Sequence, residues 1–529
     1  MKFLNNTTKL PLIIAVALFF VAFENFSFYK NVLNVYPLNL ENSGFIASLT
    51  VVLISGIIIL LTLLSSRYII KPAIIFFLWV TSLTTYFMDS YGVVIDDDMI
   101  DNMMQTNIDE SFDLLNIKLV SYVFFLAVLP SIYVFRVKIH YKKFTTEFFS
   151  SLKIIAISLV IAVAVALPLT KFYASFIREH KPLRYYTNPT YYIYSTIYYF
   201  NTLFKSNVNK VITPIGLDAH IAETNTDREL IILVVGETAR ADRFSLNGYD
   251  KKTNPLLEKE GVVSFSDFYS CGTSTAISVP CMFSLMNRSN FSKSKFKQSE
   301  NLLDVLDRAG VNVLWLDNNS DSKGVALRVD YESYKTAKNN TICDDECRDE
   351  GMLIRVQDYI NKHDKGDILI VLHQMGNHGP AYYKRYPESF EQFKPICKTN
   401  QLEKCSIEEI SNAYDNAILY TDYFLSKTID VLKQNSPAFK TALFYVSDHG
   451  ESLGENGLYL HGLPYIMAPD TQTHVGVIMW FDEKFKDNKA AVLAKKEQTF
   501  THDNVFHTVL GFFDVVTSVY NRKMDIVNN

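Results

Sequence analysis

The segment ELIILVVGE, residues 229–237, indicates how the larger part of this chain folds. Its apolar residues follow one another without alternation, which predicts a strand buried on both faces, as in a parallel sheet covered by helices. A carboxylate, Glu237, closes the run. In open α/β sheets, ligands bind at the edge where the carboxyl ends of the strands meet, so we expect Glu237 to lie at a functional site.

Four later segments have the same strand pattern, and we expect them to be buried parallel strands as well: NVLWLD (312–317), DILIVLHQM (367–375), TALFYVSDHGE (441–451) and HVGVIMWF (474–481). Helical patterns lie between the strands: SENLLDVLDRAG (299–310), DEGMLIRVQDYINKH (349–363) and SIEEISNAYDNAILYTDYFLSKTIDVLKQ (406–434). This alternation predicts a doubly wound α/β domain.

Residues able to bind a metal follow several of these strands. Asp448 and His449 come directly after the apolar run of the segment TALFYVSDHGE, and with Glu237 they supply three ligands of the type that zinc prefers. An Asp-His pair in a loop is also common as a hydrogen-bonded turn, so the prediction depends on the combination. CGTSTAISVPC (271–281) adds Thr275, a nucleophile if a metal lowers its pKa, or otherwise an ordinary helix cap.

The first 170 residues contain five long apolar stretches, and each is long enough to span a bilayer: 10–28, 44–66, 72–88, 119–135 and 154–170. Buried globular helices are the alternative, which an uncharged run such as 44–66 argues against. The first stretch could instead be a signal peptide, but no clear cleavage site follows it.

Lysine and arginine in the short loops predict the orientation of the spans. The loops after the second and fourth spans are basic, whereas residues 89–116 contain no Lys or Arg and several carboxylates. By the positive-inside rule, the amino terminus is cytoplasmic and the region after the fifth span is extracytoplasmic.

The six cysteines agree with this topology, because all lie in the extracytoplasmic region, as is typical of an oxidising compartment. They form three close couples, so we predict sequential disulfides 271–281, 343–347 and 397–405. A metal site is the alternative for the second couple. The net charge of −5 and the absence of a basic stripe argue against nucleic acid as a partner.

Three domains are therefore expected: a five-helix membrane domain (1–170), a linker at the membrane interface (171–227) and a catalytic domain (228–529). The linker is rich in tyrosine and basic residues, as amphipathic interfacial helices are. An ordinary aromatic surface of the soluble domain is the other interpretation.

Several motifs in order and spacing resemble the lipid A phosphoethanolamine transferases, the family of the mobile colistin-resistance enzymes: VVGETARADRFSLNGY, CGTSTAISVPCMFS, DNNSDSKGV, HQMGNHGPAYYKRYP, YDNAILYTD, VSDHGESLGENGLYLHGLPY and HDNVFHTVLGFF. The resemblance implies an alkaline phosphatase/sulfatase-like catalytic domain. It also implies zinc bound by Glu237, Thr275, Asp448 and His449, with Thr275 as a covalent nucleophile.

The resemblance implies roles for further residues. His378 and His461 would hold the phosphate or protonate the leaving group, and could bind a second zinc ion. Asn319 and Lys323 match positions that contact the substrate head group. In the membrane part, Asn102, Thr106 and Glu110 match a periplasmic pattern that helps to receive the lipid.

The activity implied is transfer of phosphoethanolamine from phosphatidylethanolamine to a lipid A phosphate, by a monomer in the Gram-negative inner membrane with its catalytic domain in the periplasm. The added ammonium group would lower the negative charge of the outer membrane and reduce sensitivity to polymyxin. The sequence does not identify the acceptor, so Kdo, heptose, a periplasmic glucan and a protein are alternatives to lipid A. A hydrolase of the same fold and a non-catalytic membrane sensor are the alternatives from other classes. Against a sulfatase-type hydrolase, the stretch CGTST lacks the proline and arginine that follow the nucleophile in the cysteine-type sulfatase motif. Against a sensor, the chain retains the Glu, Thr, Asp and His residues of the site.

Overall fold

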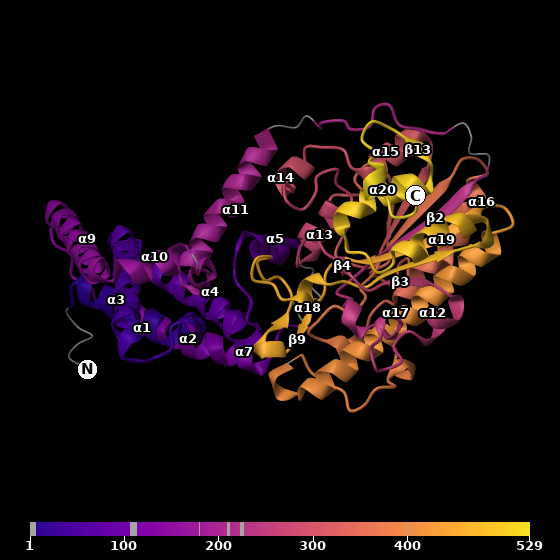
Figure 1. The fold of residues 1–529 in the computed structure, drawn as a ribbon. Helices are drawn as coiled ribbons and strands as arrows, with labels where there is room; N and C mark the ends of the chain where they lie inside the picture. The colour runs from indigo at the N-terminus through magenta and orange to yellow at the C-terminus, as the bar shows by residue number, and fades with distance from the viewer. Residues whose placement is uncertain are drawn as a thin grey trace. The chain divides into compact units, whose positions relative to one another are not determined.

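The computed structural model describes residues 7–105, 114–178, 180–208, 212–222, 227–400 and 402–528. The chain divides into two compact units, each with its own interior. One unit combines Met1–Ile100 with Leu115–Tyr199, and the other combines Asp101–Leu114 with Phe200–Asn529 (Figure 1). We refer to them as the helical unit and the catalytic unit.

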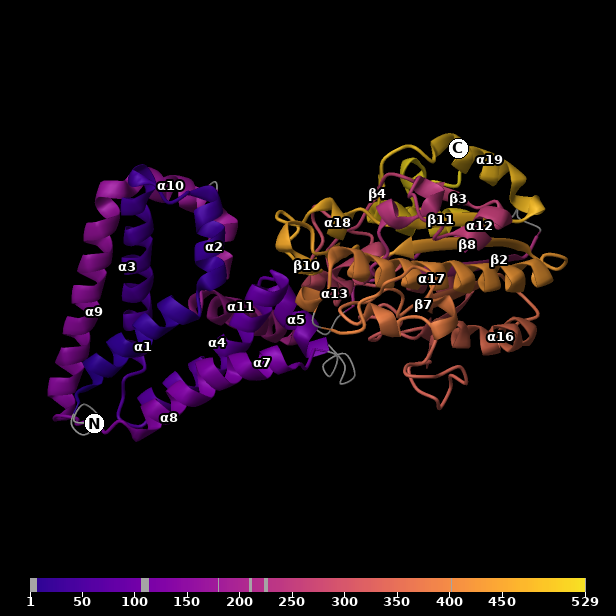
Figure 2. The same ribbon diagram turned by 90° about the horizontal axis from the view of Figure 1, so that it is seen from below.

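The amino-terminal part of the chain is helical. Its α-helices are α1 (Lys9–Phe23), α2 (Phe26–Val35), α3 (Leu40–Leu63), α4 (Ile70–Tyr91), α5 (Asp97–Gln105), α7 (Ile117–Tyr122), α8 (Leu129–Arg136), α9 (Phe144–Ala166), α10 (Thr170–Arg178) and α11 (Thr190–Val208). A π-helical turn, Val123–Val128, joins α7 to α8, so that Ile117–Arg136 forms one apolar helix. Helices α3 and α9 lie side by side (Figures 1 and 2).

Within the described residues, four helices are long and apolar enough to cross a membrane, and the second to fifth predicted stretches coincide with them. The first stretch differs from the prediction because α1 and α2 are bent by 57° at a short break, so a fifth span exists if this pair is one span. The polar residue Asn25 lies at the break, where its amide donates to the carbonyl oxygens of Phe20 (3.0 Å) and Asn188 (2.9 Å). The Asn25 side chain therefore connects the end of α1 to the segment that precedes α11.

Many apolar side chains of the spans are exposed on the surface of the helical unit. In the span that includes α9, 11% of the most apolar window is buried, and Val160 is 65% exposed. Such a surface is suited to a hydrocarbon solvent and would aggregate in water.

A seven-stranded sheet forms the centre of the catalytic unit, in the order β3-β11-β8-β2-β7-β5-β6. Its strands are β2 (Glu229–Gly236), β3 (Val263–Phe265), β5 (Asn312–Asp317), β6 (Asp330–Ser333), β7 (Ile368–His373), β8 (Lys440–Ser447) and β11 (Val477–Phe481). Strands β8, β2, β7, β5 and β6 are parallel, as predicted for those that the sequence indicated. Two-residue strands lie outside this sheet: β1 (His220–Ile221), β4 (Phe268–Tyr269), β9 (Ser452–Leu453), β10 (Tyr459–Leu460), β12 (Phe500–Thr501) and β13 (Val515–Val516).

The prediction of a parallel strand at 474–481 is wrong, because β11 runs antiparallel to both β8 and β3. The chain between β8 and β11 contains two short strands and the four-residue helix α18 (Asp470–Thr473), and no long crossover helix. A parallel return requires such a crossover, so the chain re-enters the sheet from the end at which it left. Burial on both faces, which is complete for β11, does not distinguish the two directions.

Alternate residues of β2 contribute to two separate apolar cores, one on each face of the sheet. Ile231, Leu233 and Val235 belong to a core that includes residues of α15 and α20. Their neighbours in β2 belong to a core that includes α16 and α17. Figure 1 shows α15 and α20 on one side of the sheet, and Figure 2 shows α17 alongside β2 and β8. Burial on both faces explains the continuous apolar runs of the central strands.

The helices of the catalytic unit beyond α11 are α12 (Pro255–Glu260), α13 (Thr275–Met282), α14 (Lys293–Phe296), α15 (Leu302–Ala309), α16 (Val356–Lys362), α17 (Ile407–Asn435), α18, α19 (Lys486–Lys495) and α20 (Val505–Phe512). The helix predicted at 406–434 is α17, and a capping box of Ser406 and Glu409 begins it. The helix predicted at 349–363 is a 3₁₀ segment, Asp349–Arg355, followed by α16.

All three predicted disulfides are confirmed: Cys271–Cys281, Cys343–Cys347 and Cys397–Cys405. The catalytic unit contains no free cysteine among its described residues. A metal site at the second couple is thereby excluded, because both sulfur atoms are in a disulfide.

Candidate functional site

Four neighbouring parallel strands lead into the predicted site residues. Glu237 follows β2, His378 lies in the loop after β7, and Asp448 follows β8, while Asn319 lies just beyond β5. Because these strands are parallel, their carboxyl ends meet at one edge of the sheet and bring the residues together.

Glu237, Asp448 and His449 converge at this edge. His449 Nε2 lies 3.4 Å from Glu237 Oε1 and 3.3 Å from Asp448 Oδ2, and all three side chains are fully buried. One ligand atom from each lies within 4.8 Å of the others, a spacing that can hold a metal ion. The three non-hydroxyl ligands predicted from the sequence are thus neighbours.

Hydrogen bonds fix the backbone at Thr238, the residue that follows Glu237. Thr238 has φ of +53°, a left-handed conformation that is costly for a β-branched residue. Its N–H donates to Asp448 Oδ1 at 3.2 Å, and its carbonyl oxygen accepts the hydroxyl of Tyr414. These bonds connect the segment of Glu237 to that of Asp448.

Two oxygen atoms of the cluster point to a bound cation. Glu237 Oε1 and Asp448 Oδ2 are buried and accept no hydrogen bond within the part of the chain that the structure describes. Burial and the nearby Asp448 carboxylate raise the pKa of Glu237 well above its usual value. A divalent cation between the carboxylates would offset both costs, and the mixture of carboxylate oxygens and an imidazole nitrogen fits zinc.

Thr275, the first residue of α13, places its hydroxyl beside this cluster. Its Oγ1 donates to Glu237 Oε2 at 3.1 Å and lies 3.5 Å from His449 Nε2. The neighbouring Thr273 is occupied elsewhere, since its hydroxyl donates to the Leu463 carbonyl at 2.6 Å. Of these two threonines, Thr275 is the one whose oxygen is within reach of the metal-binding group.

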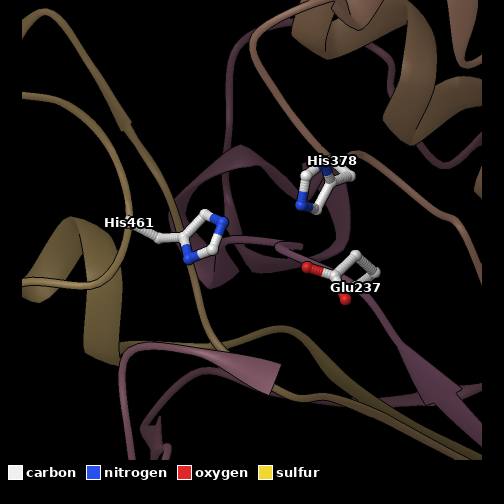
Figure 3. Close-up of side chains that lie close together, drawn as sticks. All are labelled: Glu237, His378 and His461. Carbon is white, nitrogen blue, oxygen red and sulfur yellow. The ribbon is translucent and has the colours of Figure 1, made fainter. Parts of the chain in front are cut away.

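A second group consists of Glu237, His378 and His461, whose side chains point toward one another (Figure 3). The rings of His378 and His461 are 5.5 Å apart, and the ring of His461 is 4.3 Å from that of His449. Burial and the two neighbouring histidines lower the pKa of His461 well below its usual value. This group could bind a second cation or the oxygens of a phosphate.

Asn319 and Lys323 lie on the loop after β5, and their contacts differ. The Asn319 amide donates to Glu237 Oε2 at 2.8 Å and to the Gln374 carbonyl at 2.6 Å, so Asn319 orients a ligand carboxylate. The Lys323 ammonium donates to the carbonyl and hydroxyl oxygens of Ser320, both at 2.7 Å. Contact of either residue with a substrate head group stays a prediction.

The three residues predicted in the membrane part are described incompletely. Asn102 lies in α5, whereas Thr106 and Glu110 lie outside the described residues. Their role in receiving a lipid remains a prediction.

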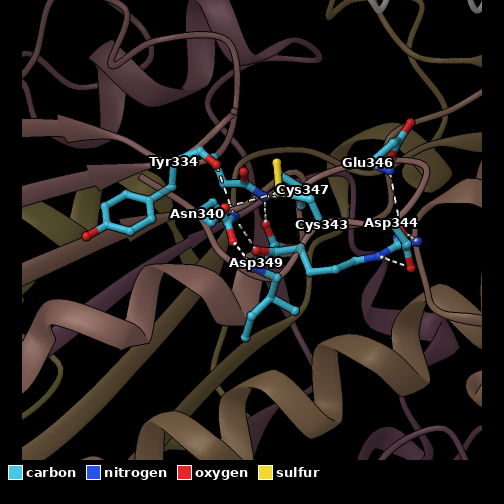
Figure 4. The surroundings of a disulfide bond; sticks show 10 residues. Tyr334, Asn340, Cys343, Asp344, Glu346, Cys347 and Asp349 are labelled. Carbon is cyan, nitrogen blue, oxygen red and sulfur yellow. Dashed lines mark hydrogen bonds and ion pairs between the residues drawn. A yellow bond between two sulfur atoms is a disulfide. The ribbon is translucent and has the colours of Figure 1, made fainter. Parts of the chain in front are cut away.

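An arginine that the sequence interpretation left without a role supports His378. Arg385 Nε donates to the His378 carbonyl at 2.6 Å, and its guanidinium forms an ion pair with Glu346. Glu346 lies between Cys343 and Cys347, in the short disulfide loop shown in Figure 4. The motif HQMGNHGPAYYKRYP contains Arg385, but no spacing rule connects it to a disulfide loop nearly forty residues earlier.

Comparisons with known proteins cover nearly the whole chain. A family model described as Sulfatase matches residues 229–515, and another, described as Phosphoethanolamine transferase EptA/EptB, matches residues 53–204. The chain is 43% identical over 515 residues to phosphatidylethanolamine transferase Mcr-2 of Escherichia coli, covering 94% of each protein. It is 41% identical over 516 residues to phosphoethanolamine transferase EptA of Salmonella typhimurium, covering 95% of this chain and 93% of that protein.

Among solved structures, the chain is similar to an integral membrane protein from Neisseria meningitidis, lipooligosaccharide phosphoethanolamine transferase A. The TM-score is 0.94 at 34% sequence identity, and the match covers 99% of both chains. This similarity extends over the helical unit and the catalytic unit alike.

Proposed function

This chain belongs to the phosphoethanolamine transferase family, and from that premise we propose that it transfers phosphoethanolamine from phosphatidylethanolamine to a phosphate of lipid A. The names of its relatives support the donor and the transferred group. The proposal of lipid A as the acceptor follows the family resemblance.

The observation that carries the proposal is the position of the Thr275 hydroxyl. It lies 3.1 Å from Glu237 Oε2, within a buried cluster in which one oxygen of Glu237 and one of Asp448 accept no hydrogen bond from the described residues. A hydroxyl in that position can lose its proton and act as a nucleophile, which an ordinary helix cap would not do.

The transfer would take two steps at Thr275. Its oxygen attacks the phosphorus of phosphatidylethanolamine, and the bond from phosphorus to the diacylglycerol oxygen breaks. That oxygen takes a proton and leaves as diacylglycerol. A phosphate oxygen of the acceptor then attacks the same phosphorus, the bond to Thr275 breaks, and Thr275 regains a proton.

The residues Glu237, Thr275, Asp448 and His449 would hold zinc, which when bound supplies Lewis-acid activation of the hydroxyl and the phosphoryl oxygen. His378 and His461, which are half-buried beside the cluster, would hold the phosphate or deliver a proton to the departing diacylglycerol oxygen. The Asn319 amide would keep the Glu237 carboxylate oriented.

We place the chain in the inner membrane of a Gram-negative cell, acting as a monomer, with the catalytic domain in the periplasm. The apolar helices, the basic loops and the three disulfides support this topology. Residues 1–170, 171–227 and 228–529 would then be the membrane domain, an interfacial linker and the catalytic domain.

The test is mass spectrometry of lipid A from cells that express the full chain. We expect a mass increase of one or more phosphoethanolamine groups, absent in cells that express Thr275→Ala. Phosphoethanolamine on Kdo, heptose, glucan or protein with unmodified lipid A would retain the transferase and correct the acceptor. Release of free phosphoethanolamine without any modified acceptor would overturn the proposal in favour of a hydrolase.

A further inference from the structure

The motif HDNVFHTVLGFF (502–513) belongs to the family resemblance, yet the proposed chemistry gives it no role. Its first residue, His502, is 1% exposed and begins a short 3₁₀ turn, His502–Asn504, between β12 and α20. This turn is far in sequence from every residue of the predicted site. The His502 side chain nevertheless contacts two segments that carry site residues.

Each ring nitrogen of His502 makes one hydrogen bond to the backbone. The N–H of Cys271 donates to Nδ1 at 3.0 Å, and the ring Nε2 lies 3.0 Å from the Ser447 carbonyl oxygen. Since the Cys271 N–H can only donate and the Ser447 carbonyl can only accept, the ring must be neutral with its proton on Nε2. Burial lowers the pKa of His502 to about 4, which agrees with a neutral ring.

The two backbone groups belong to the two sides of the site. Cys271 opens the disulfide-closed segment that contains Thr275, and Ser447 directly precedes Asp448. The Ser447 hydroxyl also donates to the His449 carbonyl at 3.0 Å and accepts the Ala239 N–H at 2.7 Å. The His502 imidazole therefore joins residues 271–281, which we call the nucleophile segment, to the end of β8. Asp448 and His449 directly follow that strand.

We propose that His502 is a positioning residue that fixes the Thr275 hydroxyl relative to Asp448 and His449. The proposal rests on the proposed function in that Thr275 is taken as the nucleophile. The disulfide Cys271–Cys281 closes the nucleophile segment on itself but does not attach it to β8. The imidazole makes that attachment, and a displacement of about 1 Å between reacting groups can reduce the rate about a hundredfold.

Three substitutions in the full-length protein separate the hydrogen bonds from the packing of the ring. His502→Asn keeps an acceptor at the position of Nδ1, His502→Gln keeps a donor near Nε2, and His502→Leu fills the volume without a polar atom. We expect kcat for transfer from phosphatidylethanolamine to lipid A to fall about ten- to a hundredfold in His502→Leu and less in the other two, with KM and zinc content near wild type. A role in packing alone predicts the reverse order, with His502→Leu the mildest.

His507 provides a matched control, because it belongs to the same motif but lies in α20, where its Nδ1 accepts the Asn521 N–H at 3.2 Å. His507→Asn should leave kcat unchanged. The proposal is overturned if His502→Leu transfers at the wild-type rate, if it loses zinc as His449→Ala does, or if His507→Asn reduces kcat equally.

Hydrogen exchange of the Cys271 amide gives a readout that does not require transfer. Protection of this amide should persist in His502→Asn and be lost in His502→Leu and His502→Gln. If the wild-type protein transfers nothing, the proposed function fails, while the exchange pattern still decides whether His502 holds the nucleophile segment. Equal protection in all variants would overturn the positioning role.

Discussion

At the scale of single residues, the Thr275 hydroxyl lies beside three buried side chains that would hold zinc under the proposed function. Thr275→Ala should abolish transfer and leave most of the bound zinc, because Glu237, Asp448 and His449 remain. Thr275→Ser should retain part of the activity, since the hydroxyl survives and the loss is the methyl group that restricts its rotamer.

Transfer assays together with zinc analysis check this prediction. Asp448→Ala and His449→Ala serve as comparisons and should lose both metal and activity. Near wild-type transfer by Thr275→Ala would require another nucleophile. Ser274 would then be the nearest candidate, because the Thr273 hydroxyl is bound to the Leu463 carbonyl.

Arg385 offers a second prediction at this scale. Arg385→Gln removes the hydrogen bond to the His378 carbonyl and the ion pair with Glu346, so we expect transfer to fall about tenfold, a change of about 1.4 kcal/mol in the activation free energy. The zinc held by Glu237, Asp448 and His449 should be retained, because His378 is outside that group.

The carboxylates of the same disulfide loop supply the control. Glu346→Gln weakens the partner of Arg385, whereas Asp344→Asn weakens the partner of Arg348, whose guanidinium reaches the Lys384 carbonyl instead. Glu346→Gln should therefore reduce transfer more than Asp344→Asn. Equal effects would mean that the loop acts through general stability.

The sequence predicted which residues converge at the site but not the contacts that hold them. Glu237, Asp448 and His449 could be foreseen because each follows an apolar strand, and parallel strands end at one edge. The contacts of Arg385 and His502 could not be foreseen. Arg385 pairs with a carboxylate 39 residues away, and both partners of His502 are backbone groups of distant segments, so no spacing of residue types predicts them. The hydrogen bond from the Asn319 amide to Glu237 is also not evident from the sequence, which predicts contact of Asn319 with the substrate head group.

At the scale of elements, two disulfides of similar length allow a controlled experiment. Cys271–Cys281 and Cys397–Cys405 join residues 10 and 8 positions apart, so each closes a loop that contributes roughly 2–3 kcal/mol of stability in the chain-entropy description. Replacing either pair with serine should therefore lower the thermal midpoint by comparable amounts.

Activity should separate the two variants. Loss of Cys271–Cys281 frees the segment that carries Thr275, so transfer by the remaining folded protein should fall at least about tenfold. Loss of Cys397–Cys405, which lies before α17, should leave transfer per folded molecule close to wild type. Specific activity normalised to folded protein measures the difference, and equal losses would contradict a positional role for the first disulfide.

Strand direction shows where sequence patterns stop being informative about elements. The apolar run at 474–481 predicted a strand correctly, and its direction was wrong because burial on both faces is shared by both directions. The deciding feature is the excursion between β8 and β11, which carries His461 and contains no crossover helix. Short strands and loops of this kind have no strong periodicity from which they could be recognised.

At the scale of the whole molecule, metal binding should couple activity to stability. Removal of zinc by a chelator should abolish transfer and lower the thermal midpoint of the catalytic unit, since a ligand present at about a hundred times its Kd stabilises the folded state by about 2.7 kcal/mol. Added zinc should restore both. Fluorescence can follow unfolding because Trp315 and Trp480 belong to the cores of this unit. An unchanged midpoint after verified removal of zinc would exclude a metal in the buried cluster.

Expression of the active chain should also change the cell surface. Each transferred ethanolamine adds an ammonium group next to a phosphate, which weakens the attraction of cationic peptides such as polymyxin. Cells that make the wild-type chain should therefore survive higher polymyxin concentrations than cells that make Thr275→Ala. Unchanged survival alongside modified lipid A would contradict this explanation of the phenotype.

The three disulfides have a consequence for how the protein is made. Each disulfide joins two cysteines that are consecutive along the chain, at separations of 10, 4 and 8 residues. If the chain emerges from the membrane in order from its amino terminus, each pair reaches the oxidising side before the following pair. An oxidase that joins consecutive cysteines during secretion would produce the native set at once, and the nascent protein would need no slow reshuffling of mispaired sulfurs.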